Sequence, residues 1–257
     1  MQWEKINVCV QKWMKQARKI ILEGRTKELC VEEKTSRCDL VTNVDKFIEK
    51  FYVDRIRETF PNSKILGEEG EADKDLDNFK GLLWIIDPID GTMNFVKQHD
   101  HFASMIAVCE NGIEKLGYIL DVTEDKLYWG GPECGVFCND QKVAPPKNLP
   151  LEEGLFGVGG KMLLSNYRNV QSAAKKSLGV RIYGSSGIEF IHVLTGKNVS
   201  YLSHLRPWDY AAGKILAEAL GLVVKTIDEE SLDMLSSSDV LVATKNAHQG
   251  IIKLMNS

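Results

Sequence analysis

Residues 84–95 combine the residue types and the spacing that best suit phosphate chemistry. An apolar run ends at Asp87, Asp90 follows three residues later, and Gly91 and Thr92 come directly after it. The proline after Asp87 favours an extended backbone, so this carboxylate should lie at the carboxyl end of a strand, and a tight turn would aim both acids at one point. Gly91 permits a close backbone approach, and the amides near Thr92 would begin a short helical turn. We therefore predict acids that hold cations beside amides that hold phosphate.

A simpler interpretation treats Asp-Pro and Asp-Gly as two turn dipeptides between a buried strand and a loop. A turn has no need of two acids, a glycine and a hydroxyl in this order, so we favour the functional interpretation. Three more acids occupy comparable places: Glu68 follows a short strand, Asp45 lies in the first turn of a helix, and Asp209 begins another helix. Taken singly, each is explained as a loop acid, a capping acid or a partner of the helix dipole.

Length and composition are those of an ordinary globular protein. The chain has 257 residues, enough for one large domain or two intimately packed halves. A formal net charge of -4 argues against nucleic-acid binding through a basic surface, although bound divalent ions would admit a phosphorylated substrate. No apolar run has the length of a membrane span, so we expect a cytoplasmic protein without a membrane partner. Its six scattered cysteines should be mostly reduced.

Hydrophobic periodicity predicts an α/β protein in two halves, residues 1–142 and 143–257, that meet at the proline-rich segment 143–150. The first half should contain, in order, a helix over 6–21 that stops at Gly24, a polar stretch over 26–38, a helix with Thr42 or Asn43 as its N-cap that ends before Pro61, and a mainly antiparallel sheet over 64–137. In the second half, strands should alternate with helices near 166–178, 186–194 and 207–220.

Four segments, 39–45, 67–69, 84–95 and 207–209, resemble in order and rough spacing the motifs of the inositol monophosphatase family, part of the lithium-sensitive, magnesium-dependent phosphatase superfamily. The resemblance covers nearly the whole chain. It implies a layered αβαβα sandwich of the inositol monophosphatase/fructose-1,6-bisphosphatase type. It also implies a phosphoric monoester hydrolase with two to three Mg²⁺ ions per active site, and a homodimer.

The resemblance further implies a role for each matching residue. Glu68, Asp87 and the backbone carbonyl of Ile89 would hold a first Mg²⁺, and Asp87, Asp90 and Asp209 a second. The catalytic set would be Asp45 and Thr92, which orient the attacking water, together with Glu68, which reaches a third, weaker metal through water. The substrate would contact the amides of Gly91 and Thr92, the mobile-loop Lys34, and the pocket residues Ser185 and Ser186.

Other chemistries have little support. Residues 157–162 lack the first glycine of a P-loop and have Met162 where a hydroxyl should contact magnesium, and residues 184–187 do not fit G-x-S-x-G. His99 and His101 flank Asp100, but we interpret both as loop residues, because the carboxylate-rich set does not indicate a softer metal.

The substrate is the open question. Family members that act on inositol phosphates usually carry an acid several residues before the Trp-Asp motif, whereas residues 201–206 contain none, and Ser203 or His204 would have to take its place. Inositol monophosphate is the favoured substrate. NADP(H), a sugar bisphosphate and a 3',5'-nucleotide bisphosphate remain alternatives on the same site. A regulatory or RNA-associated family member is the non-enzymatic alternative.

Overall fold

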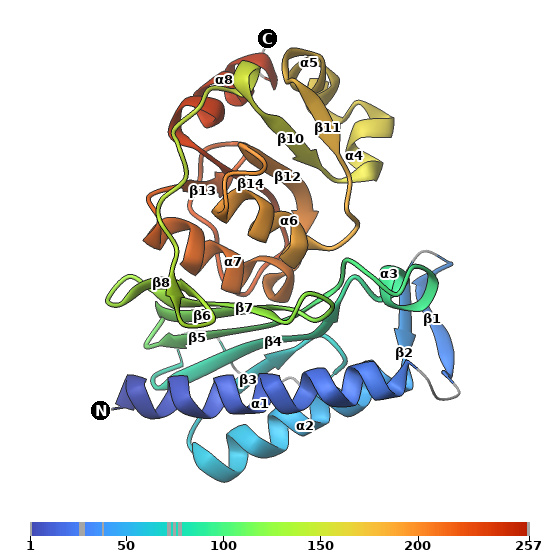
Figure 1. Ribbon diagram of the computed structural model, residues 1–257, viewed down its shortest axis with the longest axis vertical. Helices are drawn as coiled ribbons and strands as arrows, with labels where there is room; N and C mark the ends of the chain where they lie inside the picture. Colours follow the sequence, from blue (N-terminus) through green and yellow to red (C-terminus); the bar gives the residue numbers. More distant parts are fainter. Residues whose placement is uncertain are drawn as a thin grey trace.

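A computed structural model describes residues 2–25, 29–37, 39–70, 73, 76 and 79–255. Figure 1 shows five layers: two long helices, a large sheet, a central pair of helices, a second sheet, and an outer group of helices at the C-terminal end. The expected αβαβα order is confirmed. Within the described residues, no helix is long and apolar enough to cross a membrane.

The outermost layer of the first half consists of α1 (Gln2–Gly24) and α2 (Asn43–Thr59). Both predicted helices are confirmed, with Gly24 as the last residue of α1 and Thr42 as the N-cap of α2. They pack on a seven-stranded sheet of order β3-β4-β5-β6-β7-β8-β9. Its strands are β3 (Lys64–Gly67), β4 (Leu82–Asp90), β5 (Ala103–Glu110), β6 (Ile113–Asp121), β7 (Lys126–Gly131), β8 (Gly135–Cys138) and β9 (Gln141–Lys142). All neighbours pair antiparallel except β3 and β4, which are parallel.

Both faces of this sheet are buried, and the side chains alternate between them as the pleat requires. On β4, Trp84 and Ile86 join the cluster with α1 and α2, whereas Ile85 joins the cluster on the opposite face. On β5, Ile106 and Met105 divide in the same way. The continuous apolar runs in the sequence therefore reflect strands that are covered on both sides.

The polar stretch between the first two helices is only partly a loop. Its described residues include β1 (Val31–Ser36), which pairs antiparallel with β2 (Asp39–Thr42); residues 26–28 and Cys38 lie outside the described residues. The sequence did not predict this hairpin, because most side chains of β1 are exposed and no apolar alternation marks a strand. The mobility of this segment stays a prediction.

The second half contains a five-stranded sheet of order β11-β10-β12-β14-β13. Its strands are β10 (Leu155–Val158), β11 (Gly179–Arg181), β12 (Ser200–Leu205), β13 (Val223–Thr226) and β14 (Ser238–Ala243). The helices α6 (Ser186–Leu194) and α7 (Pro207–Ala219) lie between the two sheets, close to their predicted bounds, and α8 (Lys245–Met255) was not predicted.

The helix predicted near residues 166–178 corresponds to α5 (Val170–Lys176), which begins four residues later than predicted. Before it, the chain forms α4 (Gly160–Ser165) and a 3₁₀ turn (Tyr167–Asn169), and a further 3₁₀ turn, Leu151–Glu153, precedes β10. Asn166, Arg168 and Asn169 have positive φ, which interrupts any helix there.

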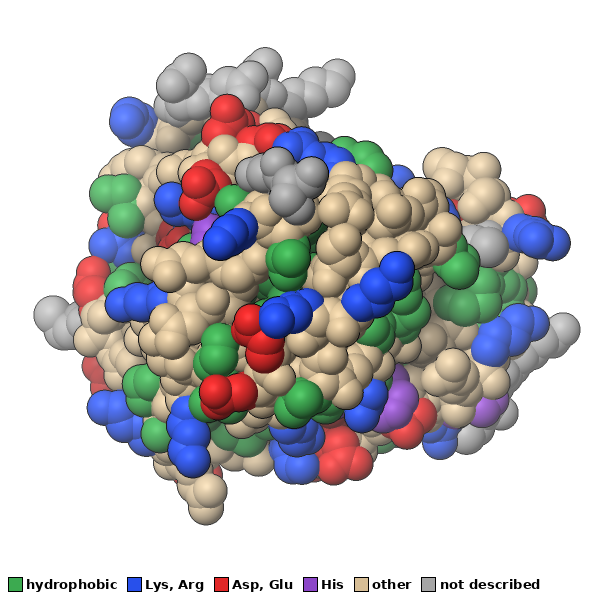
Figure 2. All heavy atoms as spheres, turned by 90° about the horizontal axis from the view of Figure 1, so that it is seen from above, with side chains coloured by type: hydrophobic (Ala, Val, Ile, Leu, Met, Phe, Trp, Pro, Cys, Tyr) green, Lys and Arg blue, Asp and Glu red, His purple; other side chains and the backbone are tan. Residues whose placement is uncertain are grey.

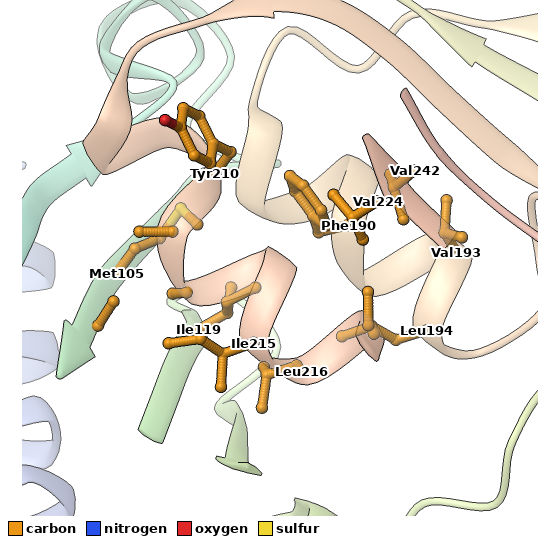
Figure 3. Packing of buried hydrophobic residues seen from close by; sticks show 14 of the residues in the cluster. Met105, Ile119, Phe190, Val193, Leu194, Tyr210, Ile215, Leu216, Val224 and Val242 are labelled. Carbon is orange, nitrogen blue, oxygen red and sulfur yellow. The ribbon is translucent and has the colours of Figure 1, made fainter. Parts of the chain in front are cut away.

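The largest buried cluster fills the space between the sheets. Figure 3 shows Phe190 of α6 and Tyr210, Ile215 and Leu216 of α7 in this layer, with Met105 and Ile119 from the first sheet. Because α6 and α7 are held from both sides, their N-terminal ends have fixed positions relative to the end of β4. The ends of these three elements meet at the candidate site.

Candidate active site

A bulge at the end of β4 brings Asp87 and Asp90 to one side. Asp87 pairs with Met105 and Asp90 with Ala103, so β4 takes three steps where β5 takes two. In a regular strand, residues three apart point to opposite faces, and the extra residue restores a common side. Asp87 has the expected extended backbone, but the tight turn predicted between the two acids is wrong, because the strand continues to Asp90.

Directly after β4, Gly91 is the N-cap of α3 (Thr92–Lys97), and the helical turn begins near Thr92 as the sequence predicts. Gly91 has φ 87°, and a Cβ at this position would lie 2.9 Å from Cβ of Ser185, so both the backbone conformation and the contact with the second half favour glycine. The first amides of a helix have no carbonyl partner within it. The N–H groups near Thr92 are therefore placed at the acid cluster without an intrahelical partner.

Asp45 lies at the third position of α2, where it caps the helix and also reaches the site. Its Oδ2 accepts a hydrogen bond from Thr42 N at 2.9 Å, and the Thr42 side chain accepts from the backbone of Asp45 in return. Its Oδ1 accepts from Thr92 Oγ1 at 2.9 Å, and the same hydroxyl lies 3.1 Å from the carbonyl oxygen of Ile89. The capping and functional interpretations thus apply to different oxygens of one carboxylate.

Asp209 lies at the third position of α7, and its Oδ2 accepts from Arg206 N at 2.8 Å. Carboxylate oxygens of Asp87, Asp90 and Asp209 lie within 4.8 Å of one another, and this is the one such group of metal-ligating side chains among the described residues. His99 and His101 lie in the turn after α3 and do not belong to it.

The N-terminus of α6 holds Asp90 through four donors. Asp90 Oδ1 accepts from Ser186 N at 3.0 Å and from Ser186 Oγ at 2.8 Å, while Oδ2 accepts from Gly187 N at 2.8 Å and from the Ser185 hydroxyl. Both predicted pocket serines therefore bind an acid of the cluster. They still line the cavity beside it.

Lys34 forms an ion pair with Glu68, whose carboxylate is close enough to act on Asp87 of the cluster. Lys34 Nζ, on β1, lies 2.9 Å from Glu68 Oε1 and 2.6 Å from Glu69 Oε1. Burial alone would lower the pKa of Lys34, but Glu68 and Glu69 raise it above its usual range. Lys34 is therefore an ammonium ion that neutralises part of the acidic charge.

The carboxylates of the cluster repel one another in a place with little solvent. Burial raises the pKa of Asp87 well above its ordinary value, and Glu68, Asp90 and Asp209 raise it further. Burial and Asp90 raise the pKa of Asp209 to about 8. Burial also raises the pKa of Asp90, although its four donors oppose the shift. The buried Oδ1 of Asp87 has no hydrogen-bond partner among the described residues. A divalent cation that prefers oxygen ligands fits this donor set, since it would bind the unpartnered Asp87 oxygen and offset the negative charge.

A cavity of about 450 Å³ adjoins the cluster and extends into the second half. Its lining includes Asp90, Asp209 and Ser185, together with Lys161, Ser203 and His204. His204 Nδ1 lies 2.7 Å from Asp239 Oδ1, which fixes the ring. Because Ser203 and His204 line the cavity, both can contact a bound ligand, as a replacement for the missing acid must.

Three buried polar residues near the site were missed in the sequence. Asn94 Nδ2 donates to the carbonyls of His101 and Tyr183, and so ties α3 to the turn before α6. Glu49 and Glu189 are each 1% exposed. The available signal was a glutamate on the buried stripe of α2 and another within the apolar run of α6.

Comparison with known proteins agrees with this geometry. The model of the inositol monophosphatase family matches residues 2–257. Inositol-1-monophosphatase of Bacillus subtilis is 40% identical over 256 residues, which cover 98% of this chain and 96% of that protein. A crystal structure of an IMPase/NADP phosphatase with Mg²⁺ and phosphate superposes with a TM-score of 0.91 at 31% identity, over 100% of this chain and 97% of the other.

A staphylococcal inositol monophosphatase-1, solved as an inhibitory complex after a 100 mM LiCl soak, superposes with a TM-score of 0.93 at 32% identity.

 The superposed region spans 99% of this chain and 95% of that structure. With a family match over almost the entire length and relatives of this similarity, the predicted resemblance is confirmed. The chain belongs to the inositol monophosphatase family.

Proposed function

We propose that this protein is a Mg²⁺-dependent phosphomonoesterase that hydrolyses inositol monophosphate. The observation that carries the proposal is the convergence of Asp87, Asp90 and Asp209, from distant parts of the chain, beside a cavity of about 450 Å³. Family membership supports the reaction class, and the structural relative with Mg²⁺ and phosphate supports the metal.

Five oxygen donors would hold two Mg²⁺ ions: Glu68, Asp87 and the Ile89 carbonyl for one, and Asp87, Asp90 and Asp209 for the other. Glu68 would also reach a third, weaker ion through water. This set leaves positions for water and phosphate, which suits an ion that retains part of its hydration shell. Bound there, the ions would supply the positive charge that lowers the pKa of a water molecule and stabilises the leaving oxygen.

The remaining residues of the site orient the reactants. Thr92 Oγ1 lies 2.9 Å from Asp45 Oδ1, so the threonine proton can point to Asp45 and leave the hydroxyl oxygen as an acceptor for the attacking water. Asp45 is anchored through its other oxygen by Thr42 N. The amides of Gly91 and Thr92 would donate to the phosphate oxygens. Lys34, close to Glu68, would approach the same region from β1.

The substrate assignment rests on the relatives and on the cavity wall. Ser203 and His204 offer hydrogen-bonding groups to the hydroxyls of a bound inositol, in place of the acid that residues 201–206 lack. NADP(H) is the first alternative, because one close structural relative is described as an IMPase/NADP phosphatase. A sugar bisphosphate and a 3',5'-nucleotide bisphosphate are the others.

Phosphate release from a panel of these four substrates, with and without Mg²⁺, tests the proposal. We expect Mg²⁺-dependent release with the highest kcat/KM for inositol monophosphate, and a loss of that preference in Ser203→Ala and His204→Ala. A higher kcat/KM for another member of the panel would overturn the substrate assignment. No release from any of them would favour the non-enzymatic alternative.

An RNA-associated role has less physical support than catalysis. The chain has a net charge of -4, and Figure 2 shows basic and acidic side chains interspersed on the described part of one face of the molecule. Binding to a nucleic-acid backbone would require a concentrated basic surface. We expect no nucleic-acid partner.

We also propose a homodimer. Leu178 and Ile182, 69% and 53% exposed, flank β11, the edge strand of the second sheet. Exposed apolar side chains beside an unpaired edge favour association with another chain. Light scattering should give twice the mass of one chain, and Leu178→Asp with Ile182→Asp should give a monomer; a wild-type monomer would contradict this.

A further inference from the structure

Two buried glutamates, one in each half of the molecule, contact loops that lead to the acid cluster. Glu49 of α2 and Glu189 of α6 are both 1% exposed, and neither belongs to the proposed metal ligands. A buried carboxyl group carries a desolvation cost, so its presence on the buried face of a helix calls for a compensating contact. Each glutamate makes such a contact with a backbone amide of a loop at the site.

Glu49 holds the loop that carries Glu68. Its Oε2 accepts a hydrogen bond from Glu69 N at 2.8 Å. A Cβ at Gly67 would overlap the Glu49 carboxyl group, so the chain has a glycine where the glutamate approaches the backbone. Residues on both sides of Glu68 are thus in contact with Glu49, which restricts the direction in which the Glu68 side chain can leave the loop.

Glu189 holds the turn before α6 in the same way. Its Oε1 accepts from Tyr183 N at 3.0 Å, and Oε2 accepts from Asn198 Nδ2 at 3.3 Å. A Cβ at Gly157 would overlap Oε2. The carbonyl of the same Tyr183 accepts from Asn94 Nδ2 at 2.6 Å, so the peptide groups at the start of this turn are fixed on both sides. The turn then leads to the serines that hold Asp90.

We propose that Glu49 and Glu189 are positioning residues for metal binding. Glu49 fixes the direction of the Glu68 side chain, and Glu189 fixes the turn before Ser185–Gly187, whose donors hydrogen-bond to Asp90. The inference rests on the proposed Mg²⁺-dependent function. Each glutamate acts as a hydrogen-bond acceptor of defined length, and its charge is not the property that matters. Outer partners of this kind typically contribute 10- to 100-fold to metal affinity or activity.

Position and charge are separated by two substitutions at each site. Glu→Gln keeps the length and one acceptor oxygen but removes the charge, whereas Glu→Asp keeps the charge and withdraws the acceptor by one methylene. Burial raises the pKa of Glu189 to about 8, so glutamine also matches the neutral form of this residue at pH 7. Both substitutions retain a polar group in a buried polar setting, which limits the disturbance of the fold. Circular dichroism and thermal unfolding would verify the fold of each variant.

The test is a titration of the full-length protein with Mn²⁺ alone, followed by electron paramagnetic resonance of the free ion. Mn²⁺ is used because it shares the oxygen-ligand preference of Mg²⁺. We expect Glu49→Gln and Glu189→Gln to bind within about threefold of the wild type, and Glu49→Asp and Glu189→Asp to bind about 10-fold more weakly. Glu114→Gln is the matched control, since it breaks a partly buried pair with Lys214 elsewhere and should leave Mn²⁺ affinity unchanged.

The outcomes distinguish the inference from the proposed function. Wild-type affinity in both aspartate variants, or a loss in the glutamine variants with retention in the aspartate variants, would overturn the positioning role. A wild-type protein that binds no Mn²⁺ and releases no phosphate with Mg²⁺ would instead overturn the proposed function. Weakened binding in Glu114→Gln equal to that of the aspartate variants would also count against the inference, because the effect would then be a general loss of stability.

Discussion

Asp45 and Asp209 use the same local device in two parts of the molecule. Each is the third residue of a helix, and each accepts a hydrogen bond from a backbone amide three residues earlier, Thr42 N and Arg206 N respectively. They differ in what the rest of the carboxylate meets. The Oδ1 of Asp45 is bound by Thr92, whereas Asp209 offers an oxygen to the group formed with Asp87 and Asp90.

A capping position does not by itself decide the role of a residue. In both helices, the cap fixes the carboxylate in space and a tertiary neighbour then gives it a function. A hydroxyl neighbour suits orientation of a water molecule, and two neighbouring carboxylates suit a cation. The two acids should therefore respond differently to the same substitution.

Of these two acids, the larger effect is expected for Asp209→Asn. It removes a charged ligand from the acid group while asparagine retains an oxygen for the cap, so the fold should persist. We predict that kcat falls about 10³-fold and that the Mg²⁺ concentration for half-maximal activity rises. Asp90→Asn should behave in the same way. Phosphate release and circular dichroism measured together would check this, and near-native turnover at low Mg²⁺ would exclude the two-metal assignment.

Asp45→Asn should lower kcat by about 10²-fold, because the acceptor for the Thr92 proton is weakened. In contrast to Asp209→Asn, it should leave the Mg²⁺ dependence close to that of the wild type. Thr92→Val should reproduce the loss in kcat. A shift of the Mg²⁺ titration curve in Asp45→Asn as large as that in Asp209→Asn would remove the distinction between the two helices.

The raised pKa of Asp209 should make the stability of the protein depend on pH. Its pKa is raised from 3.8 to about 8, so between these values the native protein retains a proton that the unfolded chain has lost. The free energy of unfolding of the Mg²⁺-free protein should therefore fall as the pH rises from 6 to 8. Saturating Mg²⁺ should flatten this slope, since a bound cation replaces the proton. An equal slope with and without Mg²⁺ in thermal unfolding would contradict this.

The smallest change in the rate of phosphate release is expected from added monovalent cations. Lithium should inhibit by occupying the site of Asp87, Asp90 and Asp209, where it supplies less charge than Mg²⁺ and retains the phosphate product. Inhibition should be uncompetitive or mixed towards substrate, and sodium should inhibit much less. Steady-state rates at fixed ionic strength decide this, and equal responses to the two ions would refute it.

Local sequence predicted the parts of the site that depend on neighbouring residues. Thr42 caps α2 as expected, Asp87 has the expected extended backbone, and α6 has its predicted bounds of Ser186–Leu194. Each of these follows from capping preference, from the effect of proline on the preceding residue, or from apolar periodicity.

The remaining features depend on partners far away in the chain. The bulge at β4 is defined by its register with β5, and the binding of the Ser185 and Ser186 hydroxyls to Asp90 joins residues about ninety-five positions apart. The β1–β2 hairpin was missed because its exposed side chains have no apolar period. Glu49 and Glu189 were missed because a glutamate in a helix is ordinary in sequence and becomes informative only when it is buried.

In the proposed function, the acid group supports phosphate hydrolysis only when it holds Mg²⁺. Phosphate release from inositol monophosphate by chelator-treated protein, measured as Mg²⁺ is added back, tests this. Asp87→Asn is the comparison, because Asp87 is shared by both proposed ion sites. We predict no release without Mg²⁺, saturable release by the wild type as Mg²⁺ is added, and none above background from Asp87→Asn. Release without any divalent ion, or an active Asp87→Asn protein, would contradict the account.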